Sequence, residues 1–77
     1  NYCVYVIRSK HKKYTYVGLT KCLERRLKEH NSGYVKKTRF YAPFTLIHTE
    51  IYSTRVATRK KEKYFKSGFG REFFKSL

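Results

Sequence analysis

The stretch Cys3-Val4-Tyr5-Val6-Ile7 decides the fold, because it is an unbroken run of residues that favour β-strands. No charged residue interrupts it, so we expect both faces of this strand to be buried. The stretch Tyr14-Thr15-Tyr16-Val17 predicts a second strand, which ends at Gly18. Only a short polar turn over residues 9–13 lies between the two strands. This spacing favours an antiparallel hairpin.

A helix and a basic loop follow the predicted hairpin. Thr20 is a suitable N-cap for a helix over residues 21–31, because its hydroxyl can accept a hydrogen bond from a free amide of the first turn. The stretch Asn31-Ser32-Gly33 is typical of a helix end. The next residues, 34–41, are rich in lysine and arginine and predict a loop.

The second half of the chain predicts one more strand and two more helices. Pro43 opens a strand over residues 44–52, whose core face holds Phe44 and Leu46, with Ile51 left open as a third core residue. Ser53 or Thr54 can cap a second helix that continues to Lys66 and ends at Ser67-Gly68. Residues 70–77 predict a short terminal helix. We expect its two phenylalanines to pack on the core: Phe73 and Phe74.

The element order is therefore β-β-α-β-α-α, which predicts an α+β fold: a three-stranded antiparallel sheet flanked by helices. A length of 77 residues allows one small domain, residues 1–77. Aromatic residues make up 18% of the chain, so large rings are expected to supply much of a small core.

The charge of the chain indicates its partners. Nineteen lysines and arginines stand against five acids, which gives a formal net charge of +14. So strong a positive field favours a polyanion, with nucleic acid as the first expectation rather than a membrane surface or a small-molecule substrate. No apolar run approaches the roughly 20 residues of a membrane span. All five acids are glutamates, so a carboxylate-rich two-metal site is not expected.

Polar residues lie on the face of the first helix that should meet the sheet. At about 100° per residue, Leu23, Arg26, Leu27 and His30 share one stripe. Two readings stay open here. Either Arg26 extends along the edge of the core and His30 is a hydrogen-bonded core residue, or the partner of Arg26 is an incoming phosphate, which an arginine can bind with two hydrogen bonds.

Glu62 is a second unusual residue, because it stands among five basic residues of the second helix. An exposed pair with Lys66, four residues on, would contribute only about 0.3–0.5 kcal/mol. The alternative is a carboxylate that holds a divalent cation against a phosphate. The charge pattern alone favours neither reading.

Taken together and in order, these pieces resemble the GIY-YIG endonuclease superfamily, and most closely its small single-domain, excinuclease-like members. The resemblance covers nearly the whole chain. It departs from the family pattern at Cys3-Val4, where the first motif usually has Gly-Ile. The matching pieces are Val4-Tyr5-Val6, Tyr16-Val17-Gly18, the stretch from Leu23 to Asn31, and Glu62 with the residues that follow it.

The resemblance implies a three-stranded antiparallel sheet flanked by helices, and hydrolysis of DNA phosphodiester bonds with one Mg²⁺ or Mn²⁺ ion, in DNA repair or recombination. It gives Glu62 the role of metal-binding glutamate and Arg26 that of catalytic arginine. His30 lies one helical turn later, where family members carry His or Tyr. The catalytic residues it implies are Tyr5, Tyr16, Arg26, His30 and Glu62.

A tyrosine is the first candidate for the group that activates or orients water. Its usual pKa near 10 makes it a poor base unless nearby cations lower that value, and the charge of this chain should act in that direction. We expect Tyr16 to take this role, with Tyr5 as the alternative. His30 can tune the tyrosine hydroxyl or take part in proton transfer.

The remaining basic residues supply candidates for contacts with the DNA backbone, although many can equally form an ordinary solvated surface. The alternatives to a complete nuclease are a non-catalytic nucleic-acid-binding module and a catalytic domain that needs a targeting protein or a second copy of itself. Since Cys3 and Cys22 predict reduced thiols, we expect a cytoplasmic protein, associated with the nucleoid if it is bacterial. The backbone-contact candidates are Lys12, Lys13, Lys36, Lys37, Arg39, Arg55, Arg59, Lys60 and Arg71.

Overall fold

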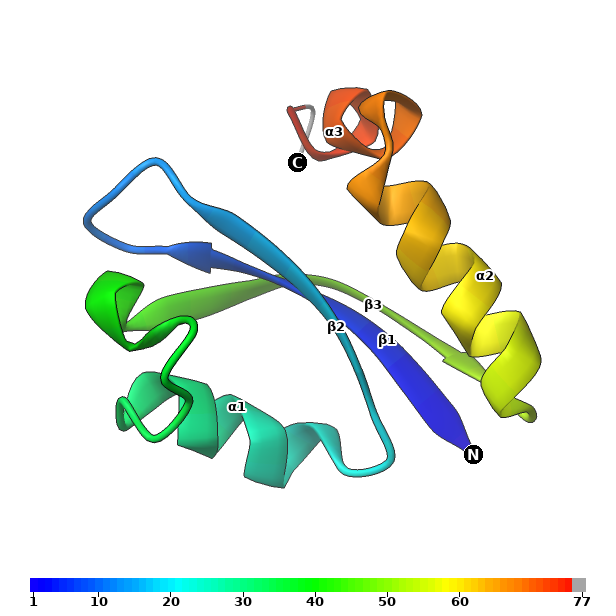
Figure 1. The fold of residues 1–77 in the computed structure, drawn as a ribbon, viewed down its shortest axis with the longest axis horizontal. Coiled ribbons are helices and arrows are strands. Elements are labelled where there is room, and N and C mark those ends of the chain that lie inside the picture. The colour runs from blue at the N-terminus through cyan, green and yellow to red at the C-terminus, as the bar shows by residue number, and fades with distance from the viewer. Residues whose placement is uncertain (76–77) are drawn as a thin grey trace.

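Three antiparallel strands form the sheet of the structure, a computed structural model that describes residues 1–75 (Figure 1). They are β1 (Tyr2–Ser9), β2 (Thr15–Thr20) and β3 (Phe44–Tyr52). The strand order is β2-β1-β3, so the first strand lies in the centre. This position explains the unbroken apolar run of β1, because helices cover both faces of the central strand.

Helices lie on both sides of the sheet: α1 (Leu23–Asn31) on one side, and α2 (Arg55–Lys66) and α3 (Gly68–Lys75) on the other (Figure 1). A short 3₁₀ turn, Arg39–Tyr41, lies within the predicted basic loop. The element order and the three-stranded antiparallel sheet confirm the predicted α+β fold.

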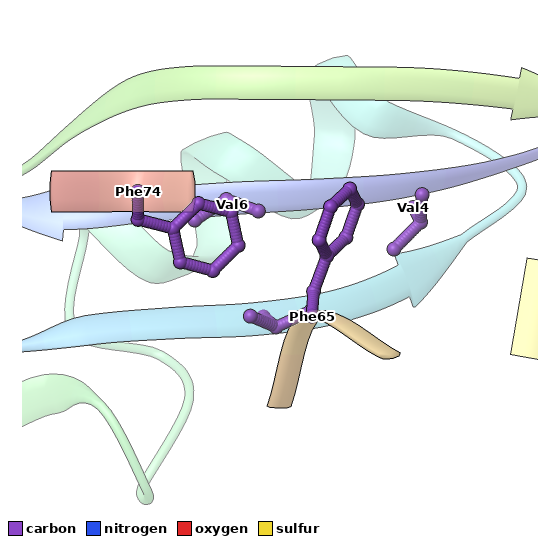
Figure 2. Packing of buried hydrophobic residues seen from close by; sticks show 5 residues of the cluster. Val4, Val6, Phe65 and Phe74 are labelled. Atoms are coloured by element: carbon purple, nitrogen blue, oxygen red, sulfur yellow. The ribbon is translucent and has the colours of Figure 1, made fainter. Parts of the chain in front are cut away.

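One core lies between the sheet and the two C-terminal helices (Figure 2). Val4 and Val6 of β1 pack there against Phe65 of α2 and Phe74 of α3. The two helices approach closely, because a Cβ on Gly70 would fall 2.4 Å from the Phe65 Cα. Glycine at this position therefore allows α3 to fold back on α2.

A second core fills the opposite face, because neighbouring residues of a strand point to opposite sides of the sheet. Cys3, Tyr5 and Ile7 of β1 pack there with Phe44 of β3. The leucines of α1 cover this group, as the predicted helical stripe requires. Tyr5 thus faces α1, whereas the valines on either side of it face α2 and α3.

Two predicted boundaries near the first helix are wrong. Strand β2 does not end at Gly18 but continues to Thr20, and Gly18 pairs with Tyr5 in the middle of the hairpin. Thr20 is not the N-cap of α1: its hydroxyl accepts a hydrogen bond from the Cys22 amide, and Cys22 is the N-cap without a side-chain bond. The helix therefore begins two residues later than predicted.

The second half of the chain confirms most of its prediction and corrects two details. Thr54 caps α2 by accepting a hydrogen bond from the Ala57 amide, which decides between the two predicted caps. Ile51 is 68% exposed and is not a core residue. The terminal helix begins at Gly68 rather than at residue 70, and residues 76–77 of its predicted range lie outside the described residues. Both phenylalanines pack on the core as predicted: Phe74 is buried, and Phe73, although 39% exposed, stacks on the Phe65 ring with 5.9 Å between ring centroids.

Cys3 and Cys22 are both free thiols, the first buried and the second exposed. Within residues 1–75, no helix has the length and apolar character that crossing a membrane requires.

Candidate active site

Tyr5 anchors a group of polar side chains beside β2, one of the two edge strands of the sheet. Its partner across the hairpin is Gly18, and a Cβ on Gly18 would fall 2.3 Å from the Tyr5 hydroxyl oxygen. The Tyr5 side chain therefore lies across β2, over the place where any other residue would carry a side chain. The absence of that side chain is what lets the tyrosine hydroxyl reach the edge of the sheet.

His30 joins Tyr5 to the loop that follows α1. The Tyr5 hydroxyl lies 2.8 Å from His30 Nε2, and His30 Nδ1 lies 2.7 Å from the hydroxyl of Thr38. Thr38 and His30 are fully buried and Tyr5 is 1% exposed. His30 is thus a hydrogen-bonded core residue, as one of the two readings of the sequence states, and it also contacts a predicted catalytic tyrosine.

Tyr16 completes an aromatic group around this histidine. It lies two residues before Gly18 on β2, and its ring centroid lies 5.2 Å from that of His30 and 6.3 Å from that of Tyr5. Tyr16 is partly exposed, whereas Tyr5 is buried. Of the two predicted tyrosines, Tyr16 is therefore the one that water and substrate reach more easily.

Arg26 lies one helical turn before His30 on the same face of α1. Its side chain is 34% exposed, and its Nη1 atom lies 3.0 Å from Glu29 Oε1. The guanidinium thus has a protein partner that the charge pattern did not reveal. It also acts on Tyr5, because its hydrogen bonding and its charge favour the ionised form of the hydroxyl.

Glu62 reaches the site from the opposite face of the sheet, on α2. It is buried, at 9% exposure, although the two basic side chains beside it are themselves more than half exposed: Lys66 Nζ lies 3.2 Å from Oε2, and Arg59 Nη1 lies 3.7 Å from Oε1. The predicted pair with Lys66 exists, but it is not the exposed pair of the first reading. The charge of Glu62 also acts on Tyr5, whose pKa it raises.

Burial dominates the protonation of the two hydrogen-bonded rings. Desolvation raises the pKa of Tyr5 to about 12, and the opposing effect of Arg26 does not offset it. This direction is opposite to the lowering that the surrounding cations predicted. Burial and the charge of Arg26 lower the pKa of His30, so this imidazole is neutral at neutral pH. A protonated Tyr5 is a hydrogen-bond donor rather than a ready base.

Glu62 is the residue that fits a divalent cation. Its Oε1 atom is buried and has no hydrogen-bond partner among residues 1–75, a costly state for a carboxylate oxygen unless a cation binds it. Within the described chain, no three histidine, cysteine or acidic side chains come together as a ligand set. A cation at Glu62 would thus take its other ligands from water and substrate oxygens, which is how Mg²⁺ commonly binds.

A basic groove begins beside Tyr16. Its volume is about 660 Å³, and Tyr14, Tyr16 and Val17 of β2 form part of its wall together with Phe65 and Phe74. Six basic side chains line this groove and no acidic one does, so it is suited to a polyanion. They are Arg8, Lys13, Lys37, Lys66, Arg71 and Lys75.

Three of the predicted backbone-contact residues line the basic groove: Lys13, Lys37 and Arg71. The others lie elsewhere. The Nζ atom of Lys12 lies 4.4 Å from the centroid of the Phe40 ring, and Arg59 pairs with Glu62. The remaining four are exposed outside the groove: Lys36, Arg39, Arg55 and Lys60.

Sequence reasoning missed Thr38 and three of the groove residues. Thr38 lies in a basic loop, where nothing in the sequence marks a threonine that turns inward. Arg8 could have been found from the two-residue period of β1, which places it on the same face as Val4 and Val6; its guanidinium donates to the Phe74 carbonyl at 2.9 Å. Lys66 and Lys75 depend on how α3 folds back on α2, which the sequence pattern does not give.

Comparison with known proteins agrees with this geometry. Residues 1–75 match the family model of the GIY-YIG catalytic domain. Among curated proteins, the chain is 43% identical over 53 residues to a UPF0213 protein of Haloquadratum walsbyi, an alignment that covers 68% of this chain and 60% of that protein. It is 37% identical over 67 residues to the UPF0213 protein YazA of Bacillus subtilis, covering 86% of this chain and 67% of YazA.

The chain thus spans about 60% of the length of the Haloquadratum relative. No solved structure matches it. The family model covers nearly every residue, and the motif tyrosines, the helical Arg26 and His30, and the α2 glutamate all lie within the matched range. This chain therefore belongs to the GIY-YIG family.

Proposed function

We propose that this protein is a divalent-metal-dependent DNA endonuclease, acting in DNA repair or recombination. The observation that carries the proposal is Glu62, a buried carboxylate with one oxygen that accepts no hydrogen bond among residues 1–75, within electrostatic reach of the Tyr5 hydroxyl. Arg59, whose Nη1 atom lies 3.7 Å away, offsets the charge of this oxygen without a hydrogen bond, and a cation-binding role requires an oxygen free to bind the ion.

The basic groove supplies the path for the DNA backbone. Its six cations come from the hairpin, the loop after α1 and the two C-terminal helices, and the groove includes Tyr16 in its wall. Lys66 lines this groove and pairs with Glu62, so a phosphate bound by Lys66 would lie near that carboxylate. Contacts with the phosphates of the DNA backbone support binding that does not depend on the DNA sequence.

Each residue of the site then has a defined task. Arg26 exchanges Glu29 for the phosphate and stabilises the negative charge that develops on it in the transition state. Tyr16, the more accessible tyrosine, orients the attacking water. Buried Tyr5 keeps its proton and hydrogen-bonds the phosphate, held in place by His30. Glu62 holds the metal ion, which when bound acts as a Lewis acid on the scissile phosphate.

Nicking of supercoiled plasmid with Mg²⁺ or Mn²⁺ tests this function. We expect metal-dependent nicking by the wild type and at least a hundredfold slower nicking by Glu62→Gln and by Arg26→Ala, because removal of one transition-state interaction commonly has roughly that effect. Matched controls are Glu72→Gln, an exposed glutamate paired with Lys75, and Arg25→Ala, an exposed neighbour on α1. Both controls should nick at the wild-type rate.

DNA binding by the same samples completes the test. If the variants bind as tightly as the wild type but do not nick, the site is catalytic. If the wild type itself binds DNA and nicks neither plasmid nor branched DNA, the chain is a binding module or a nuclease that needs a targeting partner or a second copy. That result would overturn the proposal for this chain by itself.

A further inference from the structure

A buried hydrogen-bonded series of two hydroxyls and one imidazole leads from the loop after α1 into the site. Thr38 Oγ1 lies 2.7 Å from His30 Nδ1, and His30 Nε2 lies 2.8 Å from the Tyr5 hydroxyl. Exposures of 0%, 0% and 1% exclude solvent from Thr38, His30 and Tyr5 respectively. Thr38 and His30 must therefore satisfy each other, whereas the Tyr5 hydroxyl also has Arg26 as a partner.

The N–H and O–H protons of these three side chains outnumber the hydrogen bonds between them. A neutral imidazole carries one N–H, and each of the two hydroxyls carries one O–H, so three protons share two hydrogen bonds. One hydroxyl proton must then point away from the other two side chains of the series. It belongs either to Thr38 at one end or to Tyr5 at the other.

The two ends differ in what surrounds that extra proton. Within residues 1–75, the hydrogen bond of the Thr38 hydroxyl is the one to His30, and the side chain is fully buried, so a proton pointing away from His30 would lack an acceptor. The Tyr5 hydroxyl instead lies over Gly18 at the edge of the sheet and interacts with Tyr16, Arg26 and Glu62. A proton at that end therefore points toward the other residues of the proposed site.

We propose that Thr38 is a positioning residue that fixes the tautomer of His30 and thereby the direction of the Tyr5 proton. Thr38 donates to Nδ1, Nε2–H donates to the Tyr5 oxygen, and the Tyr5 O–H points into the site as a hydrogen-bond donor to a phosphate oxygen. This role in the reaction rests on the proposed nuclease function. The tautomer itself does not, because it follows from the buried contacts alone.

The protonation of the two rings supports this arrangement. Burial and the charge of Arg26 lower the pKa of His30, which keeps the imidazole neutral, as the proton count requires. Burial raises the pKa of Tyr5, which keeps its proton available for donation. The arrangement also gives the two tyrosines different roles: Tyr5 donates a hydrogen bond, and Tyr16 orients the attacking water.

Long-range proton–nitrogen NMR correlations test the tautomer directly in the intact chain. We expect the His30 signals of a protonated Nε2 and a bare Nδ1 in the wild type and in Thr38→Ser, which keeps the hydroxyl. Thr38→Val removes the donor to Nδ1 and should shift the Nδ1 signal or mix the two tautomers. A protonated Nδ1 in the wild type would overturn the proposal, as would unchanged ring-nitrogen signals in the valine variant.

Thr58→Val is the matched control for a change of a buried threonine. Thr58 is also fully buried, but its hydroxyl donates to the carbonyl of Thr54, the N-cap of α2. In plasmid nicking, Thr38→Val should be about three- to tenfold slower at unchanged DNA affinity, and Thr38→Ser should restore the rate, as one neutral hydrogen bond predicts. An equal decrease in the nicking rate of Thr58→Val would show that Thr38 acts only through packing.

The two proposals fail in different ways. If no variant and no wild-type sample nicks DNA, the nuclease function is wrong, while the NMR signals of His30 still decide the role of Thr38. If the wild type nicks and Thr38→Val nicks equally fast, the nuclease function stands and the positioning role is wrong.

Discussion

Gly18 and Tyr5 pair across the hairpin, and the Tyr5 hydroxyl occupies the space where a side chain on Gly18 would begin. A Cβ there would fall 2.3 Å from the hydroxyl oxygen and 2.4 Å from the ring carbon that bears it. The two residues are thus one structural unit. The glycine is required by the position of the tyrosine rather than by a turn, since Gly18 lies in the middle of β2.

The variant Gly18→Ala should displace the Tyr5 ring and break its hydrogen bond to His30. We expect a decrease of about 1–3 kcal/mol in the free energy of unfolding, as for an overpacked core, and a larger relative decrease in nicking. Urea unfolding and plasmid nicking measure the two effects. Gly68→Ala is the control, because a Cβ on Gly68 meets nothing within 4 Å. Equal stability of both variants would contradict the close approach of Gly18 and Tyr5.

The stability of the protein should fall as pH falls below the ordinary pKa of His30. The folded state lowers that pKa from 6.5, so folded His30 binds fewer protons than unfolded His30. The contribution of His30 to the free energy of unfolding is therefore complete above pH 6.5 and is lost as pH falls through the pKa of the folded state. Urea midpoints across this range measure it. The decline should be smaller in His30→Gln and unchanged in His11→Gln, which alters an exposed histidine.

Glu50 should stabilise the fold without taking part in cleavage. It lies 2.7 Å from His48 Nε2, accepts a short hydrogen bond from Tyr52 and pairs with Lys61 at 3.8 Å. We expect Glu50→Gln to lower the free energy of unfolding by about 1–3 kcal/mol at neutral pH, as for hydrogen bonds to a charged group. Nicking should stay at the wild-type rate, and a severe decrease like that expected of Glu62→Gln would place Glu50 in the site instead.

The same carboxylate predicts a second effect of acid. Burial alone would raise its pKa, but the hydrogen bonds from His48 and Tyr52 and the charge of Lys61 hold the pKa of Glu50 below its usual 4.5. Its contribution is therefore present above pH 4.5 and is lost as pH falls through the lower folded value. Thermal unfolding should show wild type and Glu50→Gln converging in this acid range, whereas parallel curves would contradict the shift.

The basic groove predicts which cations carry DNA affinity. Replacing Lys13, Lys37 or Arg71 by alanine should reduce the slope of log affinity against log salt by about one for each phosphate that is no longer neutralised. Fluorescence anisotropy with duplex DNA measures it. Lys28→Ala removes one charge from an exposed residue of α1 outside the groove and is the control. Equal slopes in all four variants would show that net charge, and not the groove, governs binding.

The element order followed from sequence because each element satisfies a local rule. The unbroken apolar run of β1 indicates a strand covered on both faces, and the helical stripe of α1 indicates which residues meet the sheet. The same stripe placed Arg26 and His30 next to the sheet, where the structure has them. Thr54 could be predicted as a cap for the same reason, since its bond is to a residue three positions on.

What the sequence did not reveal depends on contacts between distant residues. Gly18 has the properties of a strand end by local rules, and only the ring of Tyr5 above it explains why β2 continues. Thr38 is a polar loop residue by composition, yet it is fully buried against a histidine eight positions earlier. The ion pair of Arg26 with Glu29 and the burial of Glu62 likewise depend on packing that no local pattern encodes.

The site takes Tyr5 from the first strand and Glu62 from the second-to-last helix, with the remaining groups between them in sequence. During synthesis, the hairpin and α1 leave the ribosome with many of the cations but without Glu62, the proposed metal-binding carboxylate. Under the proposed nuclease function, a nascent chain therefore carries cations for nucleic acid before it has a complete site for cleaving it.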